Sequence, residues 1–440
     1  MKHFKRPENG KWNLKDHKLY ESIKVSGWAM IVYDSRGWNM DKAHKAVRFL
    51  VSQAAQMGIN MDGNPPIMFP PAQHLNVAQH LRSAGHKVVQ KYRIPAPALL
   101  VVVLPTNAAD LYQAVKQQGL QHNVYRHPAP VLQVHNIGRM INAKLGGVNA
   151  KLNSSDGPGC MLDSRSSLMV IASRVMHPAP GACGRPSFSG VVGSLDSDMV
   201  RYSAVSSVLP SRVSMILDLE DMVYELIGRH SWWKTNRETR TKPFPERIVY
   251  YRSGVVDNDF PIILNVELPA IQAACKRHKI QPKVTIVLVG KRNYVRFFPT
   301  HGMADITGNC PAGTVVDNVV GNPQEFDFYL QSHSSSVGTS RPTHYSVLFD
   351  ENNLNQDEIQ ELTHALCYIG ARTTRSLSTP APLQYAETVS ARTRNHYNPS
   401  FGSDDNVELH ELPDRDDTTQ LYRENFQPAH TSMKYRMYFQ

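Results

Sequence analysis

The chain has few cysteines and no long apolar run, and these absences exclude several classes of protein. Only five of its 440 residues are cysteine, and none forms a Cys-x-x-Cys pair, so neither a disulfide framework nor a zinc knuckle is indicated. No apolar stretch approaches the roughly 20 residues of a membrane-spanning helix, and the first residues lack the apolar core of a secretion signal. We therefore expect a cytoplasmic protein with reduced thiols and no membrane partner.

Acidic residues are outnumbered by basic ones. The 48 Lys and Arg against 38 Asp and Glu give a formal net charge of +10. A basic surface of this kind suits a polyanionic partner such as nucleic acid. Charge alone is equally compatible with an ordinary soluble basic protein, so it leaves both interpretations open.

A dinucleotide-type GxGxxG motif is missing, although residues 26–150 have the pattern of a nucleotide-binding fold. The strand-like stretches GWAMIVY, ALLVVVLP and VLQVHN alternate with helical periodicity at residues 41–58, 108–119 and 136–147. Strands that alternate with helices predict a parallel sheet covered on both faces. We expect a Rossmann-like domain at 26–150 without a dinucleotide site, preceded by a linker at 1–25.

The remainder, residues 151–440, predicts a second α/β unit. It begins with a Ser-, Gly- and Asp-rich connector at 151–167, and the acidic stretch 403–417 reads as a mobile surface insertion. Strands are expected at 168–175, 187–195, 202–208, 247–255, 283–291, 325–332 and 344–351, and helices at 213–230, 268–279, 354–370 and 382–397. Three meandering strands followed by alternating strands and helices are typical of a ribonuclease H-like layout.

Two helices carry an aromatic residue and lysines on shared faces. Tyr112 and Lys116 are four residues apart, and Lys144 ends the next helix one turn after Met140. Cationic side chains can bind phosphate oxygens and an aromatic ring can stack on a base. From spacing alone, surface lysines and a half-buried tyrosine are the more common outcome.

Several segments resemble the Argonaute family. Residues 311–351 and the stretch RTTRSLSTPAPLQYAETVSARTR are similar to the C-terminal half of the PIWI domain of eukaryotic Argonautes, and YQAVK and INAKLGGVN are similar to its MID domain. The resemblance implies a Rossmann-like MID domain followed by a ribonuclease H-like PIWI domain, with the N-terminal and PAZ domains of the full-length protein absent. The pattern is most similar to a fungal Argonaute of the RNA-silencing class.

The resemblance also implies partners and binding residues. The partners are a small guide RNA with a 5′ phosphate and a target RNA. Tyr112 would stack on the first base, while the 5′ phosphate would be bound by Lys116, Lys144 and Arg392. The guide backbone would lie along Lys291, Arg292, Arg372 and Ser378. The chain departs from the family at three positions: Met140 replaces a lysine, Pro130 a glutamine and Gln384 a tyrosine.

The positions that hold two Mg²⁺ ions in active family members have mostly lost their carboxylates. The matching residues are Arg174, Ser214, Ser253 and Glu387, and only the last is acidic. Magnesium prefers anionic oxygen ligands, and a unit charge pair at about 4 Å contributes about 4 kcal/mol at an effective dielectric constant near 20. We therefore expect neither a metal nor another cofactor at this site. The other nearby candidates read as solvated or structural groups: Asp196, Asp198, Asp218, Asp257, Asp259 and His177.

The leading hypothesis is a guide-RNA-binding MID–PIWI lobe that lacks metal-dependent slicing. The alternative is an Mg-dependent endoribonuclease that cleaves target RNA opposite the guide. A third possibility is an RNA-binding fragment that uses only its charge.

Overall fold

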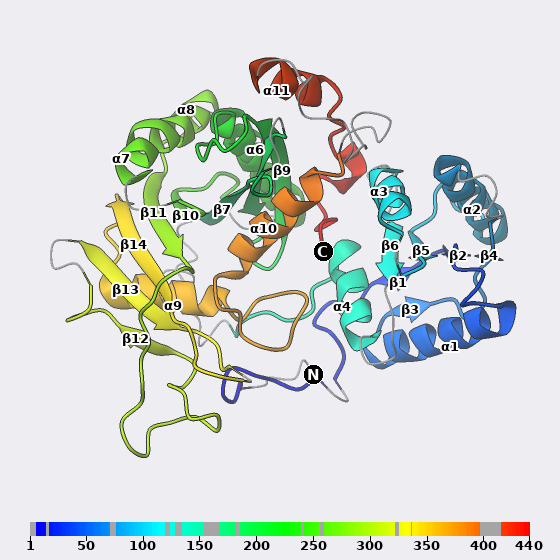
Figure 1. Ribbon diagram of the computed structural model, residues 1–440, viewed down its shortest axis with the longest axis horizontal. Helices are drawn as coiled ribbons and strands as arrows, with labels where there is room; N and C mark the ends of the chain where they lie inside the picture. Colours follow the sequence, from blue (N-terminus) through cyan, green and yellow to red (C-terminus); the bar gives the residue numbers. More distant parts are fainter. Residues whose placement is uncertain are drawn as a thin grey trace.

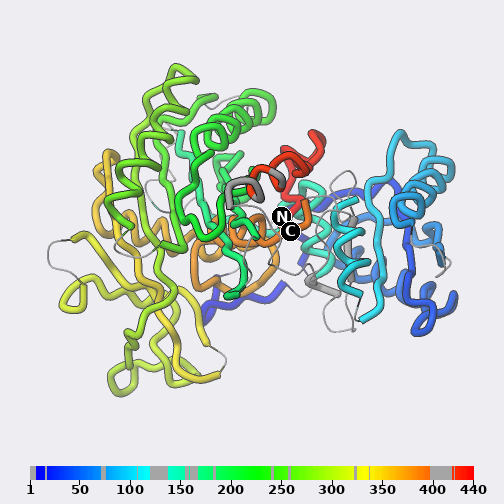
Figure 2. Tube along the Cα trace, turned by 45° about the horizontal axis from the view of Figure 1, so that its top comes forward, coloured from blue at the N-terminus to red at the C-terminus, as the bar shows by residue number. Residues whose placement is uncertain are grey.

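The chain forms two α/β units, with its C-terminus between them (Figures 1 and 2). The structure is a computed structural model. It describes residues 6–14, 17–70, 76–106, 108–118, 124–127, 134–153, 158, 167–181, 185–238, 242–255, 259–321, 325–335, 337–396 and 415–440.

The first unit is built on a four-stranded parallel sheet in the order β4-β2-β5-β6. Its strands are β2 (Trp28–Val32), β4 (Ile67–Met68), β5 (Leu99–Val103) and β6 (Val124–His127), and a small separate sheet pairs β1 (Lys24–Val25) with β3 (Asn60–Met61). Every residue of β2 and β5 is buried. Helices α1 (Met40–Gln56) and α4 (Val134–Lys144) pack on one face, and α2 (Val77–Tyr92) and α3 (Ala109–Gln118) on the other.

This arrangement confirms the expected Rossmann-like layout and corrects one strand. The predicted strand VLQVHN begins outside the described residues, and its last three residues already belong to α4. Ile137 and Ile141 are buried and four residues apart, so this segment follows a helical period toward the core. The fourth strand is β6, which the sequence analysis missed together with α2.

The second unit contains an eight-stranded sheet in the order β12-β13-β14-β11-β10-β7-β8-β9. Its strands are β7 (Leu168–Met176), β8 (Ser187–Ser194), β9 (Tyr202–Leu209), β10 (Arg247–Ser253), β11 (Lys283–Gly290), β12 (Thr314–Val316), β13 (Phe326–Gln331) and β14 (Thr343–Asp350). Strands β7 to β9 form an antiparallel meander, and β10 lies parallel to both β7 and β11. The expected ribonuclease H-like layout is confirmed.

Helices cover both faces of this sheet. One core cluster joins the sheet to α9 (Gln356–Leu366), α10 (Ala381–Thr393) and the C-terminal residues, and the other joins it to α6 (Leu219–Arg237) and α8 (Leu268–Arg277). The shorter elements are α7 (Phe260–Ile262), η3 (Ile263–Glu267), α11 (Arg415–Glu424) and η4 (Thr431–Met433). Within the described chain, no helix is long and apolar enough to cross a membrane. Most of the expected insertion at 403–417 lies outside the described residues, but its last three residues begin α11.

The chain passes between the two units twice, and the two connecting segments run side by side. Glu21 N–H donates to the carbonyl of Val148 at 2.8 Å, and Tyr20 N–H donates to that of Asn149 at 3.1 Å. Asn149 Nδ2 reaches the carbonyl of Ala371 in the second unit at 2.6 Å. Backbone pairing therefore joins the entry to the first unit with its exit, and a side chain ties both to the second unit.

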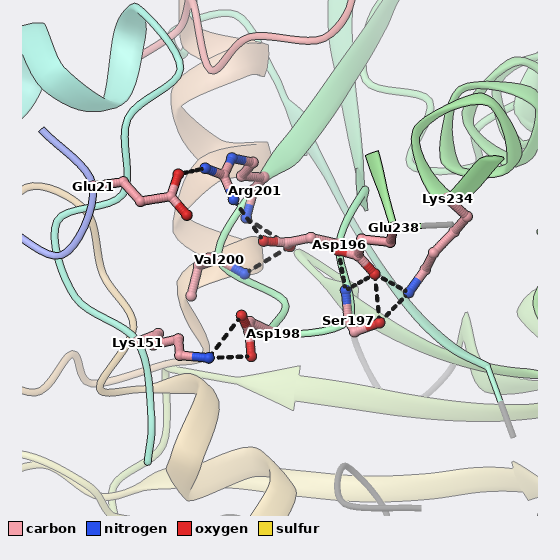
Figure 3. Close-up of polar contacts among 9 residues, drawn as sticks. All are labelled: Glu21, Lys151, Asp196, Ser197, Asp198, Val200, Arg201, Lys234 and Glu238. Atoms are coloured by element: carbon pink, nitrogen blue, oxygen red, sulfur yellow. Dashed lines mark hydrogen bonds and ion pairs between the residues drawn. The ribbon is translucent and has the colours of Figure 1, made fainter. Parts of the chain in front are cut away.

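Two ion pairs connect the turn between β8 and β9 to the two chain segments that join the units (Figure 3). Arg201 pairs with Glu21, and Asp198 pairs with Lys151 at 3.1 Å. Asp196 is buried and accepts hydrogen bonds from the backbone N–H groups of the turn, including that of Arg201 at 3.0 Å. Asp196 and Asp198 are thus held by hydrogen bonds and ion pairs of this turn, which suits a structural role.

Candidate nucleic-acid interface

Four cationic side chains gather where the two units meet. Lys144, at the end of α4, is buried, and its pKa lies well below its ordinary value. Burial is the first cause, and the positive charges of Lys116, Arg392 and Arg372 follow it. Lys116 Nζ also lies 5.5 Å from the centre of the Tyr112 ring. The cations lie up to 276 positions apart in the sequence, and the fold brings their charges together.

The second unit contributes Arg392 on α10 and Arg372 in the loop between α9 and α10. Arg392 lies with its guanidinium carbon 5.4 Å from the centre of the Tyr438 ring. Burial lowers the pKa of Arg392, and in the described structure its Nε is buried without a hydrogen-bond partner. Arg372 Nε donates to Gln440 Oε1 at 2.9 Å and its Nη2 donates to the carbonyl of Phe439 at 2.8 Å. Positive charge gathered in this way suits a compact anion such as a terminal phosphate.

One departure from the family pattern, Met140, lies one turn before Lys144 on α4. Met140 is partly buried and packs against the core of the first unit, so it adds no charge where the family has a lysine. Pro130 lies outside the described residues. Arg372, expected along the guide backbone, is close enough to Lys144 and Arg392 to lower the pKa of both, so its charge belongs to the cluster.

The other predicted backbone contacts line the second unit separately. Arg292 is exposed and follows Lys291 directly after β11. The carbonyl of Ser378 accepts a hydrogen bond from Thr343 Oγ1 at 2.6 Å, which fixes the loop before α10 to β14. Gln384 lies in the first turns of α10, where its carbonyl accepts from Thr388 Oγ1 at 2.9 Å.

The structure brings three of the four positions expected for catalysis into one group. Arg174 and Ser253 are register partners near the ends of β7 and β10, and Arg174 Nη1 lies 3.4 Å from Ser253 Oγ. Glu387 on α10 is 3.8 Å from Arg174 Nη1 and 3.6 Å from Lys291 Nζ. Arg174 and Glu387 are therefore paired, and Lys291 joins them.

A buried ion pair beneath this group escaped the sequence analysis. Arg252 and Glu267 are both fully buried, and Arg252 Nε lies 3.1 Å from each carboxylate oxygen of Glu267. Arg252 also donates to the carbonyl of Ser253 at 2.6 Å and to that of Ser214, the fourth expected position. The pair fixes the end of β10 and the loop before α6. A charged residue inside an apolar strand was the available signal, but its partner is not evident from sequence.

Asp218 and His177, which were also considered as metal ligands, have other partners. Asp218 pairs with Arg423 at 3.6 Å, and His177 is hydrogen-bonded to Ser187 Oγ at 2.9 Å. Burial lowers the pKa of His177, and neighbouring arginines lower it further. Asp257 lies outside the described residues.

These side chains do not fit a pair of magnesium ions. Around Glu387 stand a guanidinium, an ammonium and a neutral hydroxyl, whereas Mg²⁺ is held by carboxylate and other oxygen ligands and is repelled by cations. Across the described ranges, no group of three or more His, Cys, Asp or Glu side chains is arranged to hold a metal ion. The geometry supports a site for anions.

Comparisons with known proteins show the family to which this chain belongs. The "Mid domain of argonaute" family matches residues 6–85 and the "Piwi domain" family matches residues 99–398. Protein argonaute 5 of Arabidopsis thaliana is 33% identical over an alignment of 419 residues, and the match covers 88% of this chain and 40% of that protein. The chain is therefore a Mid–Piwi protein, and it belongs to the Argonaute family.

Solved structures share the fold. The C-terminal lobe of a budding yeast Argonaute superposes with a TM-score of 0.79 at 21% identity, over 98% of this chain and 89% of that one. The Kluyveromyces polysporus Argonaute with a guide RNA gives a TM-score of 0.79 at 22% identity, over 98% of this chain and 53% of that one. The chain thus spans about 40% of the length of its curated plant relative.

Proposed function

We propose that this chain is the part of an Argonaute that binds the 5′-phosphorylated end of a small guide RNA and presents the guide to a target RNA. The observation that carries the proposal is the convergence of Lys116, Lys144, Arg372 and Arg392 at the junction of the two units. A terminal phosphate carries up to two negative charges at neutral pH. Binding it there would relieve the mutual repulsion of these cations.

The Tyr112 ring, beside Lys116, supplies a surface for the first base. Base–aromatic stacking contributes about 1–3 kcal/mol and tolerates different bases. Together with the cation cluster, it supports recognition of a nucleotide end in preference to an internal stretch of RNA. This distinguishes the proposal from RNA binding by net charge alone.

We further propose that target RNA is held without metal-dependent cutting. Support comes from the occupants of the expected metal positions, where Arg174 and Ser253 stand in place of carboxylates. The likeness of the chain to the lobe of a larger Argonaute supports the proposal that N-terminal and PAZ domains complete the protein. A fungal source stays a prediction, because the relatives named above include both yeasts and a plant.

Competition between matched guides tests the proposal. Guide RNAs that differ only in a 5′ phosphate or a 5′ hydroxyl would be competed against each other on the wild-type protein and on Lys144→Met. We expect the wild type to prefer the phosphorylated guide, and the variant to lose roughly ten- to hundredfold of that preference. Arg277→Ser, which changes an exposed arginine on α8, should keep the preference. Equal affinity of the wild type for both guides would overturn the proposal and favour binding by charge alone.

A further inference from the structure

The carboxyl ends of three adjacent parallel strands place two cations around one carboxylate. In the strand order β11-β10-β7, Arg174 lies near the end of β7, Ser253 at the end of β10, and Lys291 directly after β11. Ligands of open α/β sheets bind outside this edge of the strands. Arg174 and Lys291 thus flank the end of the central strand on either side.

The carboxylate holds these two cations loosely. Glu387 lies 3.8 Å from Arg174 Nη1 and 3.6 Å from Lys291 Nζ, whereas charge-assisted hydrogen bonds are about 2.7–2.9 Å long. Its side chain is 46% exposed, against 27% for Arg174 and 34% for Lys291. Two positive charges therefore share one partly solvated negative charge, and the group keeps a net positive charge that faces solvent.

The neighbouring buried arginine is not available to a ligand. Arg252 is fully buried and bound by Glu267 and two backbone carbonyls. Because its charge is already neutralised, it acts as a rigid support that fixes Ser253. Arg174 and Lys291 therefore offer partly exposed donors on either side of the end of β10, where Ser253 is buried.

We propose that Arg174 and Lys291 clamp one phosphodiester of the target RNA strand, which displaces Glu387 from between them; Lys291 would then contact the target strand and not the guide backbone that the resemblance implies. The inference rests on the proposed function, because it requires a target strand paired to a bound guide. A phosphodiester is a monoanion with two exposed oxygens, the form that a guanidinium binds through paired N–H groups. Glu387 occupies the place of this anion when no RNA is bound. The clamp would hold the target at the point where other family members would cut it.

Replacing single charged linkages tests the clamp. Protein loaded with a 5′-phosphorylated guide would bind complementary targets that each carry one uncharged methylphosphonate, moved along the strand one linkage at a time, and the rate of target dissociation would be measured. We expect one position at which dissociation accelerates roughly ten- to hundredfold beyond its neighbours. A second series with the methylphosphonate in the guide distinguishes the two strands, and a peak there in place of the target would overturn the assignment.

Variants connect this position to the named side chains. In Arg174→Ser, the fully charged target should dissociate faster, and a methylphosphonate at the sensitive linkage should no longer accelerate dissociation. In Glu387→Gln, the target should dissociate more slowly. Arg277→Ser serves as a matched control that leaves the peak in place. A uniform profile in the wild type, or an unchanged peak in Arg174→Ser, would overturn the clamp. Guide retention is measured in parallel, because loss of the guide would count against the proposed function and not against the clamp.

Discussion

Arg174 Nη1 lies 3.4 Å from Ser253 Oγ at the carboxyl edge of two parallel strands. In a two-metal nuclease, both positions would supply anionic oxygens. Here, one is a permanent cation and the other a neutral hydroxyl, so the potential at this edge has the sign opposite to the one that a metal requires. Glu387 alone cannot reverse it, because it is shared with Lys291.

Restoring carboxylates should restore metal binding. The triple variant Arg174→Asp, Ser214→Glu, Ser253→Asp, which keeps Glu387, removes one positive charge and adds three negative ones at this edge. We expect it to bind divalent ions, measured as Mn²⁺ by electron paramagnetic resonance, while the wild type binds none tightly. Equal Mn²⁺ binding by both proteins would contradict the charge argument.

Met140, which replaces a lysine beside the cation cluster, should limit the affinity of the protein for guide RNA. Met140→Lys adds a cation one turn from Lys144, and a charge-assisted hydrogen bond contributes about 1.5–3 kcal/mol. We expect about ten- to hundredfold tighter binding of 5′-phosphorylated guide, measured by filter binding, with Met140→Leu as the control. A gain of the same size for 5′-hydroxyl guide would show that the new charge acts without recognising the phosphate.

Guide binding should be linked to a proton on Lys144. In the free protein, burial and the neighbouring cations hold the pKa of Lys144 well below its ordinary value. A bound phosphate favours the charged amine and raises this pKa. Between the two values a proton is taken up on binding, so affinity falls as the pH rises through this range.

Calorimetry in buffers of different ionisation enthalpy measures this uptake at pH 8 and above, where the 5′ phosphate has already lost its second proton (pKa about 6). Lys144→Arg should abolish the uptake, since a guanidinium stays charged. The same proton uptake in Lys144→Arg would assign it to another group.

The buried ion pair between Arg252 and Glu267 should be important for the stability of the folded protein. Glu267→Gln leaves Arg252 as a buried charge without its counter-ion, and breaking such a pair costs about 3–5 kcal/mol. We expect a loss of this size in the free energy of unfolding, measured by urea denaturation. Glu220→Gln, which affects an exposed pair with Arg277, should lose less than about 1 kcal/mol. Similar small losses in both variants would mean that Arg252 finds other partners.

The large helices and strands were predictable because their apolar side chains recur with the spacing typical of each element. Strands β7, β10 and β11 each contain a run of apolar residues, which is typical of strands buried on both faces. Helix α2 carried an equally clear signal, with buried residues four, three and four apart from Val77 to Val88. The short edge strand β6 has four residues, two of them basic, and offers no such pattern.

The candidate sites were predictable only in part. The resemblance located Lys116, Lys144 and Arg392, but the joining of Arg372 to them depends on how the C-terminal residues fold back. The pairing of Glu387 with both Arg174 and Lys291 depends on where α10 crosses the strand ends. Such contacts arise from the packing of distant segments, which local sequence patterns do not record.

Incubation of guide-loaded protein with a fully complementary target RNA and Mg²⁺ tests the central claim most directly. The account predicts that the target stays intact and bound, whether Mg²⁺ or a chelator is present. Cleavage of the target at a single phosphodiester, dependent on the guide and on Mg²⁺, would contradict it.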